Sequence, residues 1–585
     1  MQILKTLASH IKEYKRDTIA TPIIMVLEVI ADMVIPLLMA SIIDDGVNAG
    51  NMRHIIIIGI IMLIVALFGL VTGMLAAKYG SRASAGLAKN LREAMFTNIQ
   101  TFSFSNIDKF STASLVTRLT TDVTNVQNAF SMILRMAVRA PFSMLIAMIL
   151  AFSINARLSM IYVYALLILA VIIFFIMKYA TKYFRQAFPQ YDLLNESIQE
   201  NVGGIRAVKA FAREDHEMNV FKRASLRIYA IFVKAERTVC MAMPAMMAAV
   251  YACILLMSWF GAKMIVSDEL TTGQLMSLLS YCMQILMNLM MLSVIFVMIT
   301  MSQASAERIC EVLGETSDLQ NPEDPVREVP DGSIEFKNVM FKYHETSEDP
   351  VLDDINLYIP SGSVIGIMGG TGSAKTSLIN MISRLYDVNE GEVCVGGIDV
   401  RKYDLESLRN QVSVVLQKNE LFSGTILDNL RWGDPDATEE ECRQACVLAC
   451  ADDFISAMPE GYNTYIQQGG KNVSGGQKQR ICIARALLKK PKVLILDDST
   501  SAVDTATDAK IRQALKDHIP ETTKIIIAQR ISSIENADKV IVMDDGRVNA
   551  FDTPENLLKT NEIYREVYAS QKSGDADFDE IGGEH

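Results

Sequence analysis

The chain has 585 residues, more than one hydrophobic core usually supports, so at least two domains are expected. Half of the residues are hydrophobic, a high share for a soluble protein, yet 21% are charged, a high share for a chain buried entirely in a membrane. The net charge of −12 argues against nucleic acid as a partner, because neutralising phosphates requires a dominant basic face.

Six hydrophobic stretches are long enough to cross a bilayer, which takes about 20 residues each. They lie near Thr18–Ile43, Ile55–Ala76, Met132–Phe152, Leu158–Met177, Cys240–Val266 and Leu275–Met301. The links after the second and fourth stretches are long, helix-patterned and rich in Lys and Arg, whereas the other links are short. The positive-inside rule then places both termini and both long links in the cytosol, with helices that project beyond the membrane.

From about Ala304 the pattern changes to short apolar strands that alternate with helices and turns. Strands are expected within 334–343, 363–369, 412–417, 492–498, 524–529 and 539–546. The sequence therefore predicts a membrane domain over 1–303, a linker over 304–333, an α/β domain over 334–572 and an acidic, disordered tail over 573–585.

The nine cysteines form no CxxC pair, which suits a reducing compartment better than a disulfide framework. Cys442, Cys446 and Cys450 recur at every fourth position, so they share one face of a helix. A metal site there is one interpretation, but small buried cysteines on a core face are far commoner.

A glycine-rich loop follows the expected strand 363–369 and opens a helix. It reads Gly369-Gly370-Thr371-Gly372-Ser373-Ala374-Lys375-Thr376, with Ser377 next in the helix. This P-loop arrangement predicts ATP binding: backbone N–H groups wrap the phosphates, Lys375 supplies charge and Thr376 binds Mg²⁺. The general pattern has glycine at position 374, and we expect Ala374 to weaken or retain binding if its backbone is right-handed. A glycine-rich turn without nucleotide is the less favoured alternative.

Two further motifs follow the P-loop in the chain. The apolar strand Val493–Asp497 ends in a carboxylate, as a strand that holds Mg²⁺ through Asp497 requires. Before it, Val473-Ser474-Gly475-Gly476-Gln477-Lys478-Gln479-Arg480 opens a helix. In this position the segment resembles the signature of the ABC transporter family. The resemblance extends over essentially the whole chain, since six spans with long cytosolic extensions ahead of such a domain are similar to the exporter arrangement.

The resemblance implies a fold, cofactors and roles for further residues. The fold is an α-helical membrane domain of six helices with cytosolic extensions, followed by an α/β P-loop ATPase domain. Tyr343 resembles the aromatic residue that stacks on adenine, and Gln417 the residue that senses Mg²⁺ and the membrane domain. Ser501-Ala502-Val503-Asp504 resembles the loop that crosses the dimer interface, which places Asp504 at an ATP site. Taken singly, Tyr343 and Gln417 are equally well read as core and surface residues.

Two departures from the family pattern concern hydrolysis. The family has glutamate after the Walker B aspartate, where this chain has Asp498, whose carboxylate is about 1.5 Å shorter in reach. Gln529 stands where the family has a histidine against the γ-phosphate; its amide can hydrogen-bond a phosphate but carries no charge. We therefore expect slow hydrolysis at the site that contains this chain's P-loop.

In this family two ATP-binding domains enclose two nucleotides, each between the P-loop of one chain and the signature of the other. A homodimer would have two impaired sites, so the sequence predicts a heterodimer with a half-transporter that carries Glu and His. Ser474, Gly475, Gly476 and Gln477 of this chain would complete the partner's competent site. ATP and Mg²⁺ are the expected cofactors, and the expected location is the cell membrane, as a multi-pass protein.

The resemblance favours an ATP-driven exporter of amphipathic compounds such as drugs, with lipid or peptide export as variants. A sensor or regulatory membrane protein gated by ATP binding is the alternative from another class.

The last span is rich in methionine (Met276, Met283, Met287, Met290, Met291 and Met298). These side chains either line an adaptable pocket or, as we favour, pack against lipid and helices. Four charged residues in or beside spans, Glu28, Asp32, Arg135 and Arg139, are candidates for substrate contact or helix pairing.

Overall fold

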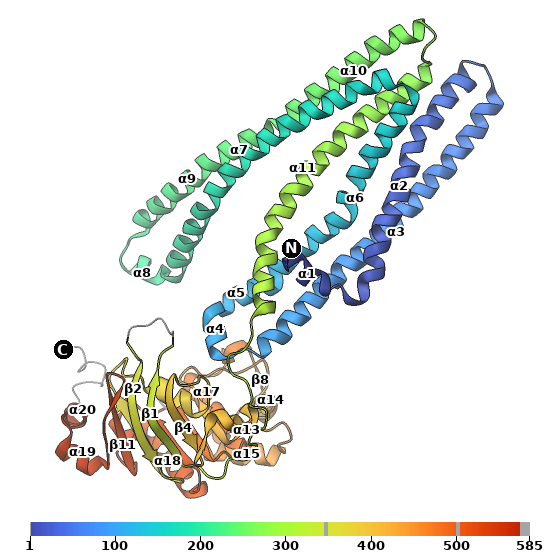
Figure 1. Cartoon of the computed structure of the whole chain (residues 1–585). Helices are drawn as coiled ribbons and strands as arrows, with labels where there is room; N and C mark the ends of the chain where they lie inside the picture. Colours follow the sequence, from blue (N-terminus) through green and yellow to red (C-terminus); the bar gives the residue numbers. More distant parts are fainter. Residues whose placement is uncertain (1, 344–348, 499–502, 574–585) are drawn as a thin grey trace. The chain divides into compact units, whose positions relative to one another are not determined.

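The computed structural model describes residues 2–343, 349–498 and 503–573 (Figure 1). The predicted acidic tail, but for its first residue, lies outside this part of the chain, as do Ser501 and Ala502. The chain divides into two compact units, one of residues 1–100 and 112–315, the other of residues 101–111 and 316–585. Each unit is described by itself.

The first unit is built from long helices that form around apolar runs. Its helices are α1 (Gln2–Ser9), α2 (Lys15–Ser41), α3 (Met52–Gln100), α5 (Thr112–Thr117), α6 (Val123–Ile154), α7 (Ala156–Gly203), α8 (Ile205–Ala210), α9 (Glu214–Cys240), α10 (Ala242–Val266) and α11 (Thr272–Gly314). Short 3-10 or π turns lie at Lys12–Tyr14, Ile42–Val47 and Arg118–Asp122. Within the described residues, six helical segments are long and apolar enough to cross a membrane, and they contain the six predicted spans. The predicted six-helix membrane domain is confirmed.

Helix ends and buried hydroxyls in this unit follow local chemistry. Thr271 begins α11 with a capping box, in which its hydroxyl and the Gln274 side chain satisfy each other's backbone N–H groups. In the core, the buried Tyr162 and Tyr281 hydroxyls donate to the carbonyl oxygens of Leu278 and Met33, at 2.6 and 2.7 Å. These bonds tie α7 to α11 and α11 to α2 without leaving a buried donor unpaired.

Where the helices continue beyond the apolar spans, charged side chains of α11 pair with those of the turn at Arg118–Asp122. Arg308 on α11 binds Asp122 with two hydrogen bonds, at 2.7 and 2.5 Å, and the Asp122 side chain is 1% exposed. Arg118 donates to Glu311 at 2.8 Å and to the Arg308 carbonyl oxygen at 3.0 Å. Such charge-assisted pairs fix α11 against the turn at Arg118–Asp122 beyond the apolar spans.

The second unit contains two main sheets. A six-stranded sheet has the order β12-β11-β3-β10-β9-β6, and a four-stranded antiparallel sheet has the order β2-β1-β4-β5. The strands are β1 (Ile334–Phe341), β2 (Leu352–Ile359), β3 (Val364–Gly369), β4 (Glu390–Val395), β5 (Ile398–Asp399), β6 (Val412–Val415), β7 (Gly424–Thr425), β8 (Tyr465–Ile466), β9 (Val493–Asp497), β10 (Thr523–Ile527), β11 (Lys539–Asp544) and β12 (Arg547–Asp552). The predicted α/β domain is confirmed.

Helices flank these sheets. They are α12 (Lys375–Ile382), α13 (Leu405–Gln411), α14 (Ile426–Leu430), α15 (Glu439–Leu448), α16 (Asp452–Ser456), α17 (Gly475–Leu488), α18 (Thr505–His518), α19 (Pro554–Thr560) and α20 (Glu562–Ser573). Strands β3, β10, β9, β6 and β11 run parallel, and every residue of β9 and β10 is buried. Because parallel strands share their carboxyl edge, the loop after β3 and Asp497 at the end of β9 lie at the same edge.

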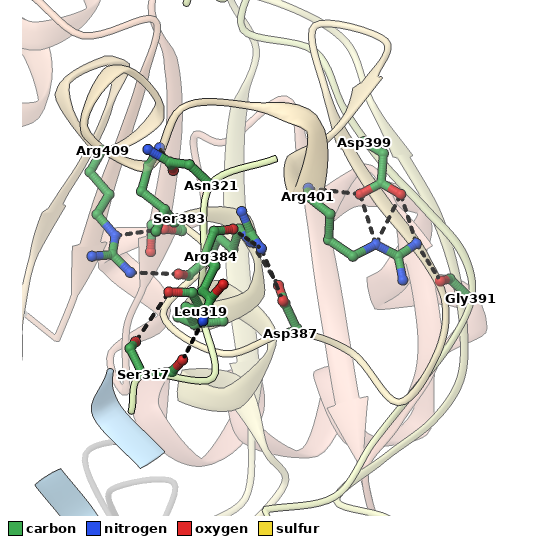
Figure 2. Close-up of polar contacts among 12 residues, drawn as sticks. Ser317, Leu319, Asn321, Ser383, Arg384, Asp387, Gly391, Asp399, Arg401 and Arg409 are labelled. Atoms are coloured by element: carbon green, nitrogen blue, oxygen red, sulfur yellow. Dashed lines mark hydrogen bonds and ion pairs between the residues drawn. The ribbon is translucent and has the colours of Figure 1, made fainter. Parts of the chain in front are cut away.

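The second unit also includes a short helix from the first long link, α4 (Phe104–Phe110), and the segment that precedes β1. Arg384, just after α12, donates to both Asp387 oxygens at 2.8 and 3.1 Å (Figure 2). It also holds the segment before β1 by donating to the Gln320 carbonyl at 3.2 Å. Asn321 donates to Asp404 at 2.7 Å and accepts from the Leu405 backbone. Part of the predicted linker is therefore held by the segment that follows α12 and by the start of α13.

Candidate nucleotide-binding site

The loop between β3 and α12 has the geometry of a phosphate cradle. Lys375, the first residue of α12, extends its Nζ back over the loop and donates to the carbonyl oxygens of Gly369 and Gly370, both at 2.7 Å. Gly372 has a φ of 86°, a conformation open to glycine without strain. The loop thus aims a lysine and the positive end of α12 at one place, as phosphate binding requires.

Ala374 has a left-handed backbone, with φ 68° and ψ 23°, immediately before α12. The condition under which the sequence predicted a harmless methyl, a right-handed backbone, is therefore not met. For a residue with a Cβ this conformation costs about 1–2 kcal/mol, because Cβ approaches the following carbonyl oxygen. The glycine that the general pattern has at this position avoids that cost, so Ala374 strains the loop.

The Thr376 hydroxyl and the Asp497 carboxylate meet at the edge of the sheet. Thr376 Oγ1 donates to Asp497 Oδ2 at 3.3 Å, and Asp497 is 3% exposed. Burial raises the pKa of Asp497, and the neighbouring Asp498 carboxylate adds to this, whereas Thr376 and Lys375 act in the opposite direction. A hydroxyl and a carboxylate oxygen side by side are the ligand types that Mg²⁺ takes in nucleotide sites.

Asp498 also has positive φ, 45°, and its backbone N–H donates to the Ile527 carbonyl at 3.0 Å. Gln417 Nε2, from the segment after β6, lies 3.5 Å from Asp498 Oδ2. The structure therefore brings together Gln417 and Asp498 at the carboxyl edge of β6 and β9. A residue with a Cβ at positive φ carries backbone strain, and here that strain lies directly after Asp497.

Tyr343 lies against α12. Its hydroxyl shares a hydrogen bond of 2.9 Å with Ser377 Oγ, and the residue is 40% exposed. The ring packs at right angles on Tyr386, with centroids 5.2 Å apart, and on Phe341 at 4.8 Å. The accessible part of the ring beside the P-loop helix is where an adenine base could stack.

Tyr386 connects this aromatic group to α4. Its hydroxyl donates to Asp108 Oδ2 at 2.7 Å, and its ring lies 6.0 Å from that of Phe104. Burial and the Asp108 carboxylate raise the pKa of Tyr386, so the phenol stays protonated and donates. Ser105 on α4 also donates to Asp318 at 2.7 Å. The sequence analysis did not single out Tyr386, whose signal is an aromatic residue shortly after the P-loop helix.

The signature segment begins α17. Ser474 is its N-cap: Ser474 Oγ accepts from the Gln477 backbone at 3.3 Å, while Gln477 Oε1 accepts from the Ser474 backbone at 2.9 Å. This capping box holds Gly475 and Gly476 in the first turn, where their backbone N–H groups have no partner within the helix. The first turn of α17 is thus built to offer N–H donors to an anion.

Gln529 and Asp504 occupy the segments after β10 and before α18. Gln529 is exposed, and its carbonyl accepts from Gln571 Nε2 at 2.9 Å. Gln571 Oε1 in turn accepts from the Ile531 backbone at 2.8 Å. Gln571 on α20 therefore clamps the backbone on both sides of Arg530, a role that no sequence motif indicates. Asp504 caps α18 by accepting from the Thr507 backbone at 2.9 Å, and hydrogen bonds from the side chain and backbone of Thr507 lower the pKa of Asp504.

The cysteines expected on one helical face belong to packing and not to this site, and Cys450 lies beyond the end of α15 with a φ of 52°. Cys442 and Cys446 on α15 are fully buried in the core of the second unit. Within the described residues, no group of three His, Cys, Asp or Glu side chains is arranged to hold a metal ion. The cysteine face of α15 packs against the core, with burial raising the pKa of Cys446 to about 12.

In the first unit, three of the four charged residues predicted in or beside the spans pair with one another, whereas the Nε of the fourth, Arg135, is buried without a hydrogen-bond partner. Arg139 on α6 forms ion pairs with Glu28 and Asp32 on α2, the latter at 2.7 Å. A cavity of about 550 Å³ adjoins this cluster and is lined by side chains of α2, α6 and α11. Met283 and Met287 line it together with Asp32, Arg139, Gln284 and Asn288. At least two of the methionines, for which we favoured packing over a pocket, therefore line a cavity.

Comparison with known proteins agrees with this reading of the two units. A family model described as the ABC transporter transmembrane region matches residues 18–290, and one described as ABC transporter matches residues 352–501. The chain is 35% identical to YfiB of Bacillus subtilis over 563 residues, 96% of this chain and 98% of YfiB. It is 35% identical to Rv1273c of Mycobacterium tuberculosis over 574 residues, 97% of this chain and 98% of that protein. Both relatives are described as uncharacterized ABC transporter ATP-binding proteins.

Proposed function

The chain belongs to the ABC transporter family, and we propose that it is one half of a heterodimeric exporter of hydrophobic or amphipathic compounds, with the impaired ATP site on its own P-loop. The chain is a multi-pass membrane protein whose ATP-binding domain hydrolyses ATP coupled to transport. In the proposed heterodimer the two ATP sites differ in their hydrolysis rates, and the transported substrate is hydrophobic or amphipathic.

One observation supports a heterodimer: this chain has Asp498 and Gln529 at the two sequence positions where a competent site has glutamate and histidine. Asp498 reaches Gln417 at 3.5 Å but is one methylene shorter than the family's base, so a water held by a longer carboxylate lies out of its reach. Gln529 supplies no positive charge to a γ-phosphate. Hydrolysis then falls to a second site, made by a partner's P-loop and this chain's Ser474–Gln477 segment.

For ATP itself, the proposal gives the residues these roles. Tyr343 stacks on adenine, and the loop Gly369–Ser377 holds the phosphates through backbone N–H groups and Lys375. Thr376, Gln417 and Asp497 hold Mg²⁺, and Asp504 lies at the dimer interface. The contacts that support this are the pairs Thr376–Asp497, Gln417–Asp498 and Tyr343–Ser377.

The cavity in the membrane unit supports an amphipathic substrate. Its lining combines flexible apolar side chains, Met33, Met283 and Met287, with the polar Gln284 and Asn288. Thioethers adapt to different apolar shapes, while a few polar groups orient the ligand. Lipid or peptide export would use the same domain arrangement with another lining.

We further propose the domain limits 1–303, 304–333, 334–572 and 573–585, and a plasma-membrane location with both termini and the ATP-binding domain in the cytosol. The Lys and Arg content of the two long links supports this orientation.

The test is the ATPase activity of the purified chain alone and together with a candidate partner that carries the Walker B glutamate and the switch histidine. We expect little activity from the chain alone and robust activity from the pair, abolished when the partner's glutamate is changed to glutamine. Robust hydrolysis by this chain alone, lost in Asp498→Asn, would overturn the impaired site. ATP binding without hydrolysis by the chain alone and with every candidate half would favour the sensor instead.

A further inference from the structure

A second cavity lies in the second unit of the chain, which we call the ATPase unit, outside the P-loop. We call it the α18 pocket; it has a volume of about 350 Å³ and is bordered by α18, the start of β10 and the segment after Ser532. Three of its lining residues are cations, Arg512, Lys516 and Lys524. Among the described residues that line it there is no carboxylate, although acidic residues outnumber basic ones in the chain by 67 to 55.

Lys524 is the residue that most needs a partner in this pocket. It is 3% exposed, and its Nζ donates to the Ile519 carbonyl oxygen at 2.6 Å. In the described part of the chain it forms no ion pair, while a buried charge is normally paired because losing its hydration is costly. Burial and the nearby Lys516 lower the pKa of Lys524, and Asp538 only partly offsets them.

Two carboxylates near the pocket, Asp508 and Asp538, each accept hydrogen bonds through one oxygen. Asp508 Oδ2 accepts from Arg512 at 3.1 Å and from Ser533 Oγ at 2.9 Å. Asp538 Oδ2 accepts from the Val364 backbone at 2.8 Å. The Nε of Arg512 and Oδ1 of Asp508 are both buried without a hydrogen-bond partner. Arg512 is paired with Asp508, whereas Lys516 and Lys524 form no ion pair among the described residues, so the pocket keeps positive charge that no carboxylate of its own neutralises.

We propose that the α18 pocket binds a small phosphate-type anion, either inorganic phosphate or the phosphate group of a small metabolite, between Arg512, Lys516 and Lys524. Its volume is at the low end of ligand cavities, about 300–1,000 Å³, which suits a compact ligand. Arginine and lysine are the side chains that bind phosphate oxygens with charge-assisted hydrogen bonds. Arg512 also donates to the Ser532 carbonyl at 2.8 Å, so the anion would adjoin the segment that follows Gln529.

The test uses the full chain in detergent with Lys375→Ala, which removes phosphate binding at the P-loop. Inorganic phosphate is titrated at constant ionic strength, and its dissociation constant is taken from the rise in the thermal unfolding midpoint. We expect Lys516→Gln to raise this constant at least tenfold and Lys516→Arg to restore it within threefold. Lys510→Gln, an exposed lysine on the same helix that does not line the pocket, should leave it within twofold.

A parallel titration with glycerol phosphate separates the two sources, because tighter binding than that of phosphate identifies an organic phosphate as the better ligand. Hydrogen exchange locates the site: phosphate should slow exchange in residues 505–518 and 531–537. The proposal is overturned if chloride at equal ionic strength produces the same midpoint shift, or if Lys516→Gln and Lys510→Gln bind phosphate equally. Lys516 is exposed, so its variants are expected to fold with the parent's midpoint in the absence of phosphate.

Discussion

Ala374 is the residue at which the P-loop departs most from an unstrained backbone, with its φ of 68°. Changing it to glycine should stabilise the ATPase unit by about 1 kcal/mol, because glycine adopts this conformation without a Cβ clash. The same change should tighten ATP binding by lowering the energy of the loop conformation that holds phosphate. Thermal unfolding of the full chain, with and without ATP, measures both effects.

Ala569→Gly provides the matched control for this change. Ala569 is exposed within α20, where the helix is right-handed, so glycine there should destabilise by about 1 kcal/mol. Opposite signs at the two alanines would show that handedness, and not the loss of a methyl, causes the effect. A lower midpoint for Ala374→Gly would contradict the strain argument.

Asp498→Glu should raise the ATPase rate of the purified chain by about tenfold or more, since the added methylene returns the carboxylate toward the position of a general base. Asp498→Asn is the control, because it keeps the size of the side chain but removes the base. If the glutamate and asparagine variants hydrolyse ATP equally slowly, the shortened side chain is not what limits this site. Phosphate release under saturating ATP–Mg²⁺ is the measurement.

At this scale, chemistry was easier to predict than conformation. The type and order of residues in the P-loop are visible in the sequence, and Thr376 and Asp497 do lie within 3.3 Å of each other. The handedness of Ala374 was not predictable, because it is set by how the loop joins β3 to α12. Gln571 escaped notice for a related reason: its partners, Gln529 and Ile531, are far away in sequence and are bound through their backbone.

Helix α4 is held on the ATPase unit by polar and aromatic contacts. One of them is the Tyr386–Asp108 hydrogen bond, and the ring of Tyr386 also contacts the ring of Tyr343. Tyr386→Phe keeps the ring and removes this bond, which should loosen α4 by about 1 kcal/mol. Hydrogen exchange of residues 103–111 should then become faster. Tyr358→Phe, at an exposed position on β2, should leave that exchange unchanged, and equal effects of both variants would contradict the link.

The contact between Arg384 and Asp387 holds the segment before β1 in place (Figure 2). The Arg384 side chain is 5% exposed, so Asp387→Asn leaves a buried guanidinium without its countercharge. Repulsion is added by Arg409, which donates to the Arg384 carbonyl at 2.7 Å and whose own pKa is lowered by burial and by Arg384. We expect a loss of about 2 kcal/mol, seen as a lower unfolding midpoint.

A surface pair in the same unit serves as the control. Asp353 pairs with Arg547, whose side chain is 70% exposed, so Asp353→Asn should leave the midpoint unchanged within error. Equal losses in the two variants would mean that the Arg384 contact is no more important than a solvated ion pair.

Sequence patterns at the element scale predicted the parallel strands well, because β3, β9 and β10 are continuous apolar runs between turns. They did not single out β2 and β4, which belong to the antiparallel sheet. The reason is visible in β2, where buried residues alternate with exposed ones, including Asp354 and Asn356. A strand with one solvated face carries a weaker apolar signal than one buried on both faces.

On the scale of the whole molecule, the two units are built differently because the first is surrounded by lipid and the second by water. Helices that cross the bilayer satisfy their backbone internally, so apolar runs of sufficient length define the first unit. The second unit depends on a close-packed core between its sheets and helices. Hydropathy alone therefore predicted the division, whereas the assignment of α4 to the ATPase unit required contacts between distant segments.

The orientation of the chain in the membrane gives the last prediction. The short link after α2 contains Asn51, and the turn between α8 and α9 contains Arg213, both exposed. Single cysteines at these positions, in a background without the nine native cysteines, should react differently with a membrane-impermeant maleimide in intact cells. The positive-inside rule places Asn51→Cys outside, where it is labelled, and Arg213→Cys inside, where labelling requires permeabilised cells. The reverse pattern would place the ATP-binding domain away from cytosolic ATP, and the proposed exporter would then have no energy source.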